Sequence, residues 1–161
     1  MNKLYIFITV ILLIGSSSIY SQEESFFGGT HENKNYLYGD LGFGIVNLAG
    51  SLRFNYERQI FKKNAINLTA RTGLGYWFDW TAYGIQVPLG VQAIFFKSAS
   101  HLELGIGALW YTNFAENKNE TYTLFNFGYR YQKPGGKFIF RANAEYFGSY
   151  LMPIISFGAS F

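Results

Sequence analysis

The sequence contains no cysteine and has few charged residues. Without cysteine, the chain can form neither a disulfide framework nor a thiolate metal site. Charged residues make up 14% of the chain, against about 25% in an average soluble domain. The formal net charge of +3 does not indicate a nucleic-acid partner. Also missing is any run of about 20 apolar residues, the length that a membrane-spanning helix requires. These absences exclude a disulfide-stapled fold and a helical membrane protein.

Aromatic residues and glycine are abundant instead. Phe, Tyr and Trp account for 20% of the chain, and glycine occurs 18 times among its 161 residues. A chain of this length has room for one domain. Aromatic side chains are enriched in strands, and glycine lets neighbouring backbones approach closely. The composition therefore favours an all-β fold with a crowded interior.

The N-terminus has the three-part pattern of a secretory signal peptide. A short start with Lys3 is followed by an apolar stretch of eleven residues, 4–14, and then by mostly small and polar residues up to Ser21. Eleven residues at about 1.5 Å each are too short to cross a hydrocarbon core of about 30 Å. We therefore expect residues 1–21 to be removed on export and residues 22–35 to form a polar lead.

From residue 36 to the last residue, apolar and polar side chains alternate with a period of two. This alternation is typical of half-buried strands, and each segment has roughly the 9–11 residues that a tilted membrane strand needs. Eight segments make an even number, as expected of a single-chain barrel with both termini on one side. The sequence thus predicts that 36–161 is an eight-stranded antiparallel transmembrane β-barrel with short loops. The predicted strands are 36–46, 48–60, 66–78, 83–95, 101–110, 123–132, 138–146 and 155–161.

The two faces of these strands differ in a way that identifies their solvents. One face is continuously Leu, Ile, Val, Phe and Tyr, and turning it to water would expose far more apolar area than a soluble monomer tolerates. The other face is rich in glycine and carries the charged groups, so we expect it to line the barrel interior. A soluble barrel with the apolar face inside is the alternative. The predicted inner ions are Asp40, Arg53, Glu57, Arg71, Glu103, Arg130, Arg141 and Glu145.

The inner face carries four arginines and four carboxylates, so its charges cancel. An unpaired ion in a narrow, poorly hydrated lumen would be costly, whereas a hydrogen-bonded network is tolerated. With tight turns assumed, the register puts Glu103 opposite Arg130 and Glu57 diagonal to Arg71. The prediction is a lumen filled by paired side chains, with a narrow pore gated by their rearrangement as the alternative.

Tyrosine and tryptophan residues near the strand ends predict aromatic girdles at the two membrane interfaces. By our assignment of the faces these side chains point outward. Trp77 instead falls on the inward face beside Asp79, which suggests a bulge or a loop contact there. The predicted girdle residues are Tyr36, Tyr56, Tyr76, Tyr83, Trp110, Tyr129, Tyr131 and Tyr146.

The chain ends on an alternating segment that finishes with an aromatic residue. Ile155, Phe157 and Phe161 share one face of this segment. It resembles the C-terminal signal read by the outer-membrane barrel assembly machinery. The resemblance implies that this machinery is a partner during biogenesis and that the three residues form the assembly signal.

A wider resemblance covers residues 36 to 161. The segments 73–76, 88–91, 103–107 and 128–132, followed by Phe140-Arg141-Ala142, resemble a family of small outer-membrane barrels of Bacteroidota, similar to OmpA/OmpX-like eight-stranded barrels. The Thr-Pro that usually follows the Arg-Ala pair in that family is absent here. The resemblance implies a fold and a location in the cell outer membrane, but no mechanism.

One short string has the residue types of an acyl-transfer site. Ser98, Ser100, His101 and Glu103 lie within six residues, and lipid A-modifying barrels use a histidine with a serine and a carboxylate. We expect His101 instead to hydrogen-bond within the network of Glu103 and Arg130, because the string is placed at the periplasmic turn. The other histidine, His31, lies in the polar lead. No catalytic residue, metal ligand set or cofactor-binding loop is predicted, so we expect no enzyme.

The sequence therefore predicts a structural or interaction role in the cell envelope, alone or as a subunit of a larger membrane complex. Outer-membrane lipid is expected to surround the barrel as a partner. The predicted outer loops are all short, and 113–120 has the best claim to a surface contact. A narrow gated pore and a lipid A-modifying enzyme remain the other hypotheses. The predicted outer loops are 46–50, 79–82, 113–120 and 148–153.

Replacing Phe161 by aspartate, or deleting it, should impair assembly, because an outward-facing aromatic group of the last strand is lost. We expect the heat-modifiable, folded form of the protein to fall several-fold in the membrane fraction, as measured by gel migration. Normal membrane levels of the Phe161→Asp variant would refute the role of this residue in assembly.

Overall fold

The computed structural model describes residues 34–44, 49–63, 66–95 and 99–161. The predicted signal peptide, and the predicted lead up to residue 33, lie outside the described residues, as does Ser98. No helix within the described ranges is long and apolar enough to cross a membrane.

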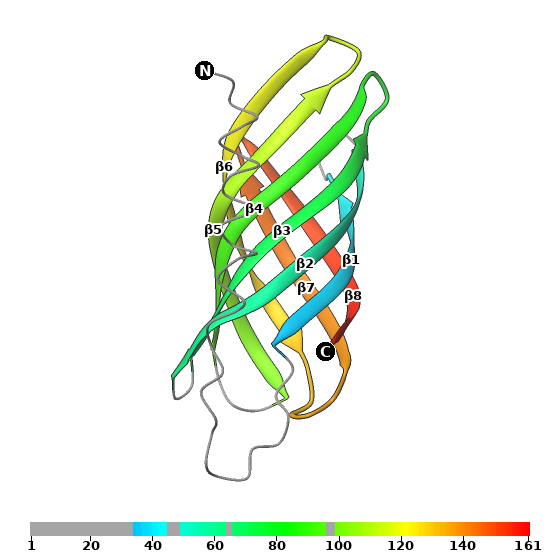
Figure 1. Ribbon diagram of the computed structural model, residues 1–161. Coiled ribbons are helices and arrows are strands. Elements are labelled where there is room, and N and C mark those ends of the chain that lie inside the picture. Colours follow the sequence, from blue (N-terminus) through cyan, green and yellow to red (C-terminus); the bar gives the residue numbers. More distant parts are fainter. Residues whose placement is uncertain (1–33, 45–48, 64–65, 96–98) are drawn as a thin grey trace. The chain divides into compact units, whose positions relative to one another are not determined.

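In the described ranges, eight strands form a closed barrel in which each strand pairs antiparallel with its neighbours in the sequence (Figure 1). β1 also pairs with β8 and so closes the ring. The predicted eight-stranded antiparallel barrel is therefore confirmed. The strands are β1 (Asn35–Phe43), β2 (Gly50–Lys63), β3 (Ile66–Phe78), β4 (Tyr83–Phe95), β5 (Ser100–Asn113), β6 (Lys118–Tyr131), β7 (Phe138–Phe147) and β8 (Tyr150–Ser160).

At the end away from the termini, β5 to β8 extend further than predicted, whereas β1 ends at Phe43 instead of residue 46 and β2 begins at Gly50 instead of residue 48. β6 begins at Lys118 instead of residue 123, and β8 begins at Tyr150 instead of residue 155. Here backbone pairing continues after the alternation of apolar and polar residues has stopped, so periodicity misses it. Two predicted loops therefore shrink to turns, of which one contains Asn117 and the other Gly148, both with positive φ. The β5–β6 hairpin reaches well past β7 at that end, since the pairing of β6 with β7 begins only at Leu124 (Figure 1).

The barrel closes through the last residue of the chain. The backbone N–H of Phe161 donates to the carbonyl of Asn35 at 2.9 Å, and the N–H of Asn35 donates to the carbonyl of Phe161 at 3.0 Å. The side chains of Ile155, Phe157 and Phe161 are exposed on the outer face. Of the residues predicted to guide assembly, Ile155 and Phe157 thus belong to β8, the strand that joins the two ends of the sheet, and Phe161 directly follows it.

The outer face of the barrel is apolar, as predicted. Large exposed side chains project from every strand, and most of the predicted girdle residues are among them. The prediction is wrong for Tyr36, which is 3% exposed and points into the barrel. Along β1 it lies an even number of residues from the inward-facing Asp40, so the two side chains share the inner face. Examples of exposed apolar side chains are Leu37, Phe54, Leu74, Val91, Ile106, Phe127, Leu151 and Phe157.

The described irregularity in pairing lies in β2 and not at Trp77. The register between β2 and β3 shifts between Gln59 and Phe61, whereas Trp77 pairs regularly with Ser51 and Gly84. Of the two expectations for Trp77, a bulge or a loop contact, the bulge is therefore wrong. Its indole N–H instead donates to the carbonyl of Thr112 in β5 at 2.9 Å.

Apolar side chains pack in the lumen on both sides of the charged middle layer. Tyr36, Tyr38 and Ile139 pack together toward the end that holds the termini. A second buried cluster lies toward the opposite end, above the charged middle layer. Its members are Leu109, Leu124, Phe147, Met152 and Ile154. Sequence reasoning assigned the inner face to polar residues and glycine and missed this cluster, because its members stand where the strands pass beyond the charged layer.

A glycine allows β4 and β5 to meet closely. A Cβ added at Gly107 would lie 2.2 Å from the carbonyl oxygen of Leu89, whereas one added at Gly39 would have its nearest contact at 3.9 Å. Gly107→Ala should lower the free energy of unfolding by about 1–3 kcal/mol, the usual cost of overpacking. Gly39→Ala, the matched control, should leave it unchanged or raise it. Urea titration of the folded barrel in detergent measures both, and equal effects would contradict this account.

Candidate functional site

The eight predicted ions meet inside the barrel. They come from β1, β2, β3, β5, β6 and β7, and none is more than 3% exposed. Each stands at an inward position of its strand, so barrel closure brings them to one layer. The lumen thus holds the most concentrated set of charged groups in the described residues, as the sequence predicted. The lumen ions are Asp40, Arg53, Glu57, Arg71, Glu103, Arg130, Arg141 and Glu145.

Four of these ions form a ring of alternating charge. Arg53 contacts Asp40 at 3.1 Å and Glu145 at 2.7 Å. Arg71 contacts the same two carboxylates, Asp40 at 2.9 Å and Glu145 at 2.8 Å. Two positive and two negative groups therefore neutralise one another inside a low-dielectric space, where such attraction is strong.

The other four ions form a chain. Arg130 pairs with Glu57 at 2.7 Å and also contacts Glu103, while Arg141 contacts Glu103 at 2.8 Å. Arg141 lies 3.9 Å from Asp40, and this contact joins the chain to the ring. The whole network is neutral and continuous across the lumen.

Neutral side chains complete the coordination of the carboxylates. The Ser156 hydroxyl donates to Asp40 at 2.6 Å, the Asn143 amide to Glu103 at 2.9 Å, and the Tyr38 hydroxyl to Glu57 at 3.0 Å. The Tyr38 ring also lies 4.2 Å from the Arg141 guanidinium carbon, within cation–π range. These contacts replace part of the water that the ions lose on burial.

The partners within the network differ from those predicted. Glu103 stands opposite Gly128 and reaches Arg130 diagonally, so the pair forms but the predicted register is wrong. Glu57 stands directly opposite Arg71, yet its ion pair is with Arg130. Register between adjacent strands did not decide the partner of Glu57, because long side chains in a narrow barrel also pair across the lumen, as Glu57 of β2 does with Arg130 of β6.

The members of the serine, histidine and acid string that the structure describes do not converge. His101 is half-buried on the inner face with its Nε2 3.4 Å from the carbonyl of Gln132, whereas Ser100 is exposed and its hydroxyl lies 2.9 Å from that of Tyr129. Glu103 is already held by two arginines. In the described ranges no group of three or more His, Cys, Asp or Glu residues is placed to hold a metal ion.

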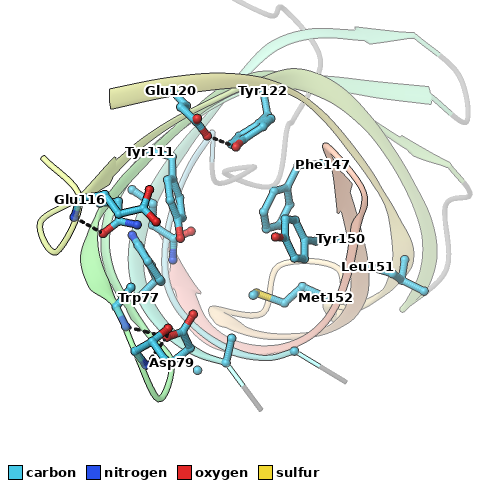
Figure 2. A pocket seen from close by; sticks show the side chains of 17 residues that line it. Trp77, Asp79, Tyr111, Glu116, Glu120, Tyr122, Phe147, Tyr150, Leu151 and Met152 are labelled. Atoms are coloured by element: carbon cyan, nitrogen blue, oxygen red, sulfur yellow. Dashed lines mark hydrogen bonds between the residues drawn. The ribbon is translucent and has the colours of Figure 1, made fainter. Parts of the chain in front are cut away.

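A cavity of about 310 Å³ opens at the end of the barrel opposite the termini. Figure 2 shows Tyr111 projecting into it from one wall and Phe147 and Tyr150 from the facing wall. Its floor is apolar, because Phe147 and Met152 belong both to its lining and to the buried cluster below. Sequence reasoning missed this cavity. The signal in the sequence was aromatic residues at inward positions near strand ends, of which only Trp77 was noticed.

Comparison with known proteins supports the fold alone. The chain is similar to the N-terminal β-barrel domain of Pseudomonas aeruginosa OprF, with a TM-score of 0.62, 13% identity, and 81% of this chain and 98% of that chain covered. It is also similar to a structure from the de novo design of transmembrane β-barrels, with a TM-score of 0.53, 12% identity, and 80% and 96% covered. No protein-family model and no curated protein sequence matches it. The architecture is thus that of known eight-stranded barrels.

Removing one carboxylate from the ring should be costly. Glu145→Gln leaves Arg53 and Arg71 with Asp40 as their shared carboxylate, and we expect a loss of about 3–5 kcal/mol in the free energy of unfolding. Glu116→Gln removes an exposed ion pair with Lys118 and should cost less than about 1 kcal/mol.

The charge-neutral double variant Glu145→Gln with Arg53→Gln tests whether charge imbalance is the cause. Its loss should be smaller than the sum of the two single losses in urea unfolding experiments. Strictly additive losses would contradict a coupled network.

Proposed function

We propose that this protein is a small integral outer-membrane β-barrel with a filled lumen and a structural or interaction role in the cell envelope. The observation that carries the proposal is the polarity of the barrel: apolar side chains cover its outside, and its ions are buried inside. This arrangement is the reverse of a soluble barrel, which packs large apolar groups inside. Lipid is the solvent that suits such a surface.

The dimensions of the strands support this location. The described strands contain between 9 and 14 residues, and a tilted strand needs about 9–11 to cross a membrane. Closure of the sheet leaves no edge strand among the eight described strands, as lipid demands of backbone polar groups. The similarity to a designed barrel described as transmembrane agrees with this proposal. Export through the cleavable signal peptide 1–21 belongs to it.

The filled lumen favours a structural or interaction role over transport. The ionic layer spans the middle of the lumen, and the apolar cluster of Leu109, Leu124, Phe147, Met152 and Ile154 closes it above. A water-filled path would have to break both. The proposed partners are outer-membrane lipid, the barrel assembly machinery during biogenesis, and a larger membrane complex of which this barrel is a subunit.

A narrow gated pore is the second candidate function. The observation that favours it is the division of the network into a ring and a chain, which among the described residues are joined by one long ion pair, Arg141 to Asp40 at 3.9 Å. Separation of the two parts at this contact would shift charged groups within the lumen. Catalysis is not proposed, because Ser100 and His101 lie on opposite faces of β5.

Planar-bilayer recording separates the two functions. Barrels whose insertion is confirmed by heat-modifiable migration and vesicle flotation should produce no steady conductance at voltages that leave the bilayer intact. Reproducible conductance steps from the wild-type protein would overturn the filled-lumen role and favour the gated pore.

A further inference from the structure

We propose that the cavity at the loop end of the barrel binds a small organic cation that carries a hydroxyl group, such as an amino alcohol of the choline type. This site is separate from the ionic layer and does not depend on where the barrel resides. Its volume of about 310 Å³ lies at the lower end of ligand pockets, which run from about 300 to 1,000 Å³.

Five aromatic rings line the cavity in an unbroken series. Trp77 stacks on Tyr111 with ring centroids 4.3 Å apart, and Tyr111 meets Tyr122 edge to face at 6.2 Å. Tyr122 lies 6.3 Å from Phe147, which lies 5.9 Å from Tyr150. Because each ring is held by the next, the faces are arranged before a ligand enters. Ring faces carry negative charge density and attract cations.

The charge at this end favours a positive ligand. The described loop-end segments 79–82, 113–120 and 148–153 contain three carboxylates and one lysine, a net charge of −2. All three carboxylates, Asp79, Glu116 and Glu120, line the cavity. Lys118 pairs with Glu116 at 2.8 Å. A cation entering the cavity would therefore meet both carboxylates and aromatic faces.

Asp79 and Glu120 are fixed in place by their neighbours. The backbone N–H groups of Thr81 and Ala82 donate to Asp79, each at 2.7 Å, and the hydrogen bond from Thr81 lowers the pKa of Asp79 below its usual value. Asp79 is thus ionised at neutral pH. The hydroxyl of Tyr122 donates to Glu120, which Figure 2 shows beside the rings.

An unused donor on the cavity wall specifies the hydroxyl. Gln86 lines the cavity and is 1% exposed, and its amide Nε2, with less than 1 Å² of exposed area, has no hydrogen-bond partner in the part of the chain that the structure describes. A buried amide donor without a partner carries a desolvation cost of about 1–3 kcal/mol. Rotation of the Gln86 side chain toward the cavity would let a ligand oxygen accept from Nε2 and remove that cost, while the cationic end of the ligand lies against the rings.

A metal ion and an anion both fit the cavity less well. In the described residues its carboxylates do not form a group placed to hold a metal ion. The basic groups gather instead at the opposite end of the barrel, so anions are drawn away from this cavity and cations toward it. The basic residues described at that end are Lys34, Arg58, Lys62, Lys63, Lys133 and Lys137.

Fluorescence titration with choline tests the proposal directly. The full-length barrel in detergent with Trp80→Phe and Trp110→Phe retains Trp77 as its one tryptophan, since the sequence has three. Both replaced residues are exposed, so the fold should survive, as heat-modifiable migration checks. Choline should change the Trp77 emission saturably. Its neutral isostere 3,3-dimethyl-1-butanol should bind at least 10-fold more weakly.

Variants assign the interaction to its residues. Asp79→Asn and Glu120→Gln keep their hydrogen-bond acceptors but lose charge, and each should weaken choline binding several-fold. Gln86→Leu should weaken choline more than tetramethylammonium, which has no hydroxyl. Lys137→Gln, at the opposite end, is the control and should leave choline affinity unchanged. Two results would overturn the proposal. One is a titration that does not saturate by roughly 10 mM choline, which corresponds to an affinity too weak to be useful. The other is equal affinity for choline and the neutral isostere.

Discussion

Mutual neutralisation of ions in the lumen is the interaction on which the rest of this structure depends. Four arginines and four carboxylates are buried within one layer, and every one of them contacts an ion of opposite charge. An ion left alone there would cost several kcal/mol. The interior therefore constrains the barrel as a unit, since no strand that carries an ion can be displaced without exposing the partner of that ion.

This network is better understood as a device for specificity than as a source of stability. Buried ion pairs often contribute no more than apolar residues of similar volume, whereas breaking one is expensive. A one-residue slip of any strand would turn its ions to the outer face and its apolar side chains inward. Ions such as Arg53 and Arg71 thus fix the register of β2 and β3. The apolar outer face alone would fix it less strictly, because one apolar side chain there can replace another.

The two ends of the barrel differ in chemistry. The end that holds the termini is basic and is packed inside by Tyr36, Tyr38 and Ile139. The opposite end is acidic, ringed with aromatic groups and open to a cavity above an apolar floor. A barrel that is closed through its middle can still bind a ligand at its mouth, because the cavity does not extend into the ionic layer. A structural or interaction role and ligand binding are therefore compatible in this molecule.

Sequence by itself determined the fold class, the number of strands and the membership of the ionic layer. These properties follow from a period of two, which is local, and which assigns a side chain such as Arg53 or Glu145 to the inner face from its position alone. The tertiary structure decided which ions pair, as with Glu57 and Arg130, and created the aromatic cavity where strands outlast their alternation. Those contacts join residues from non-adjacent strands across a closed lumen, and their geometry exists only after the ring has closed.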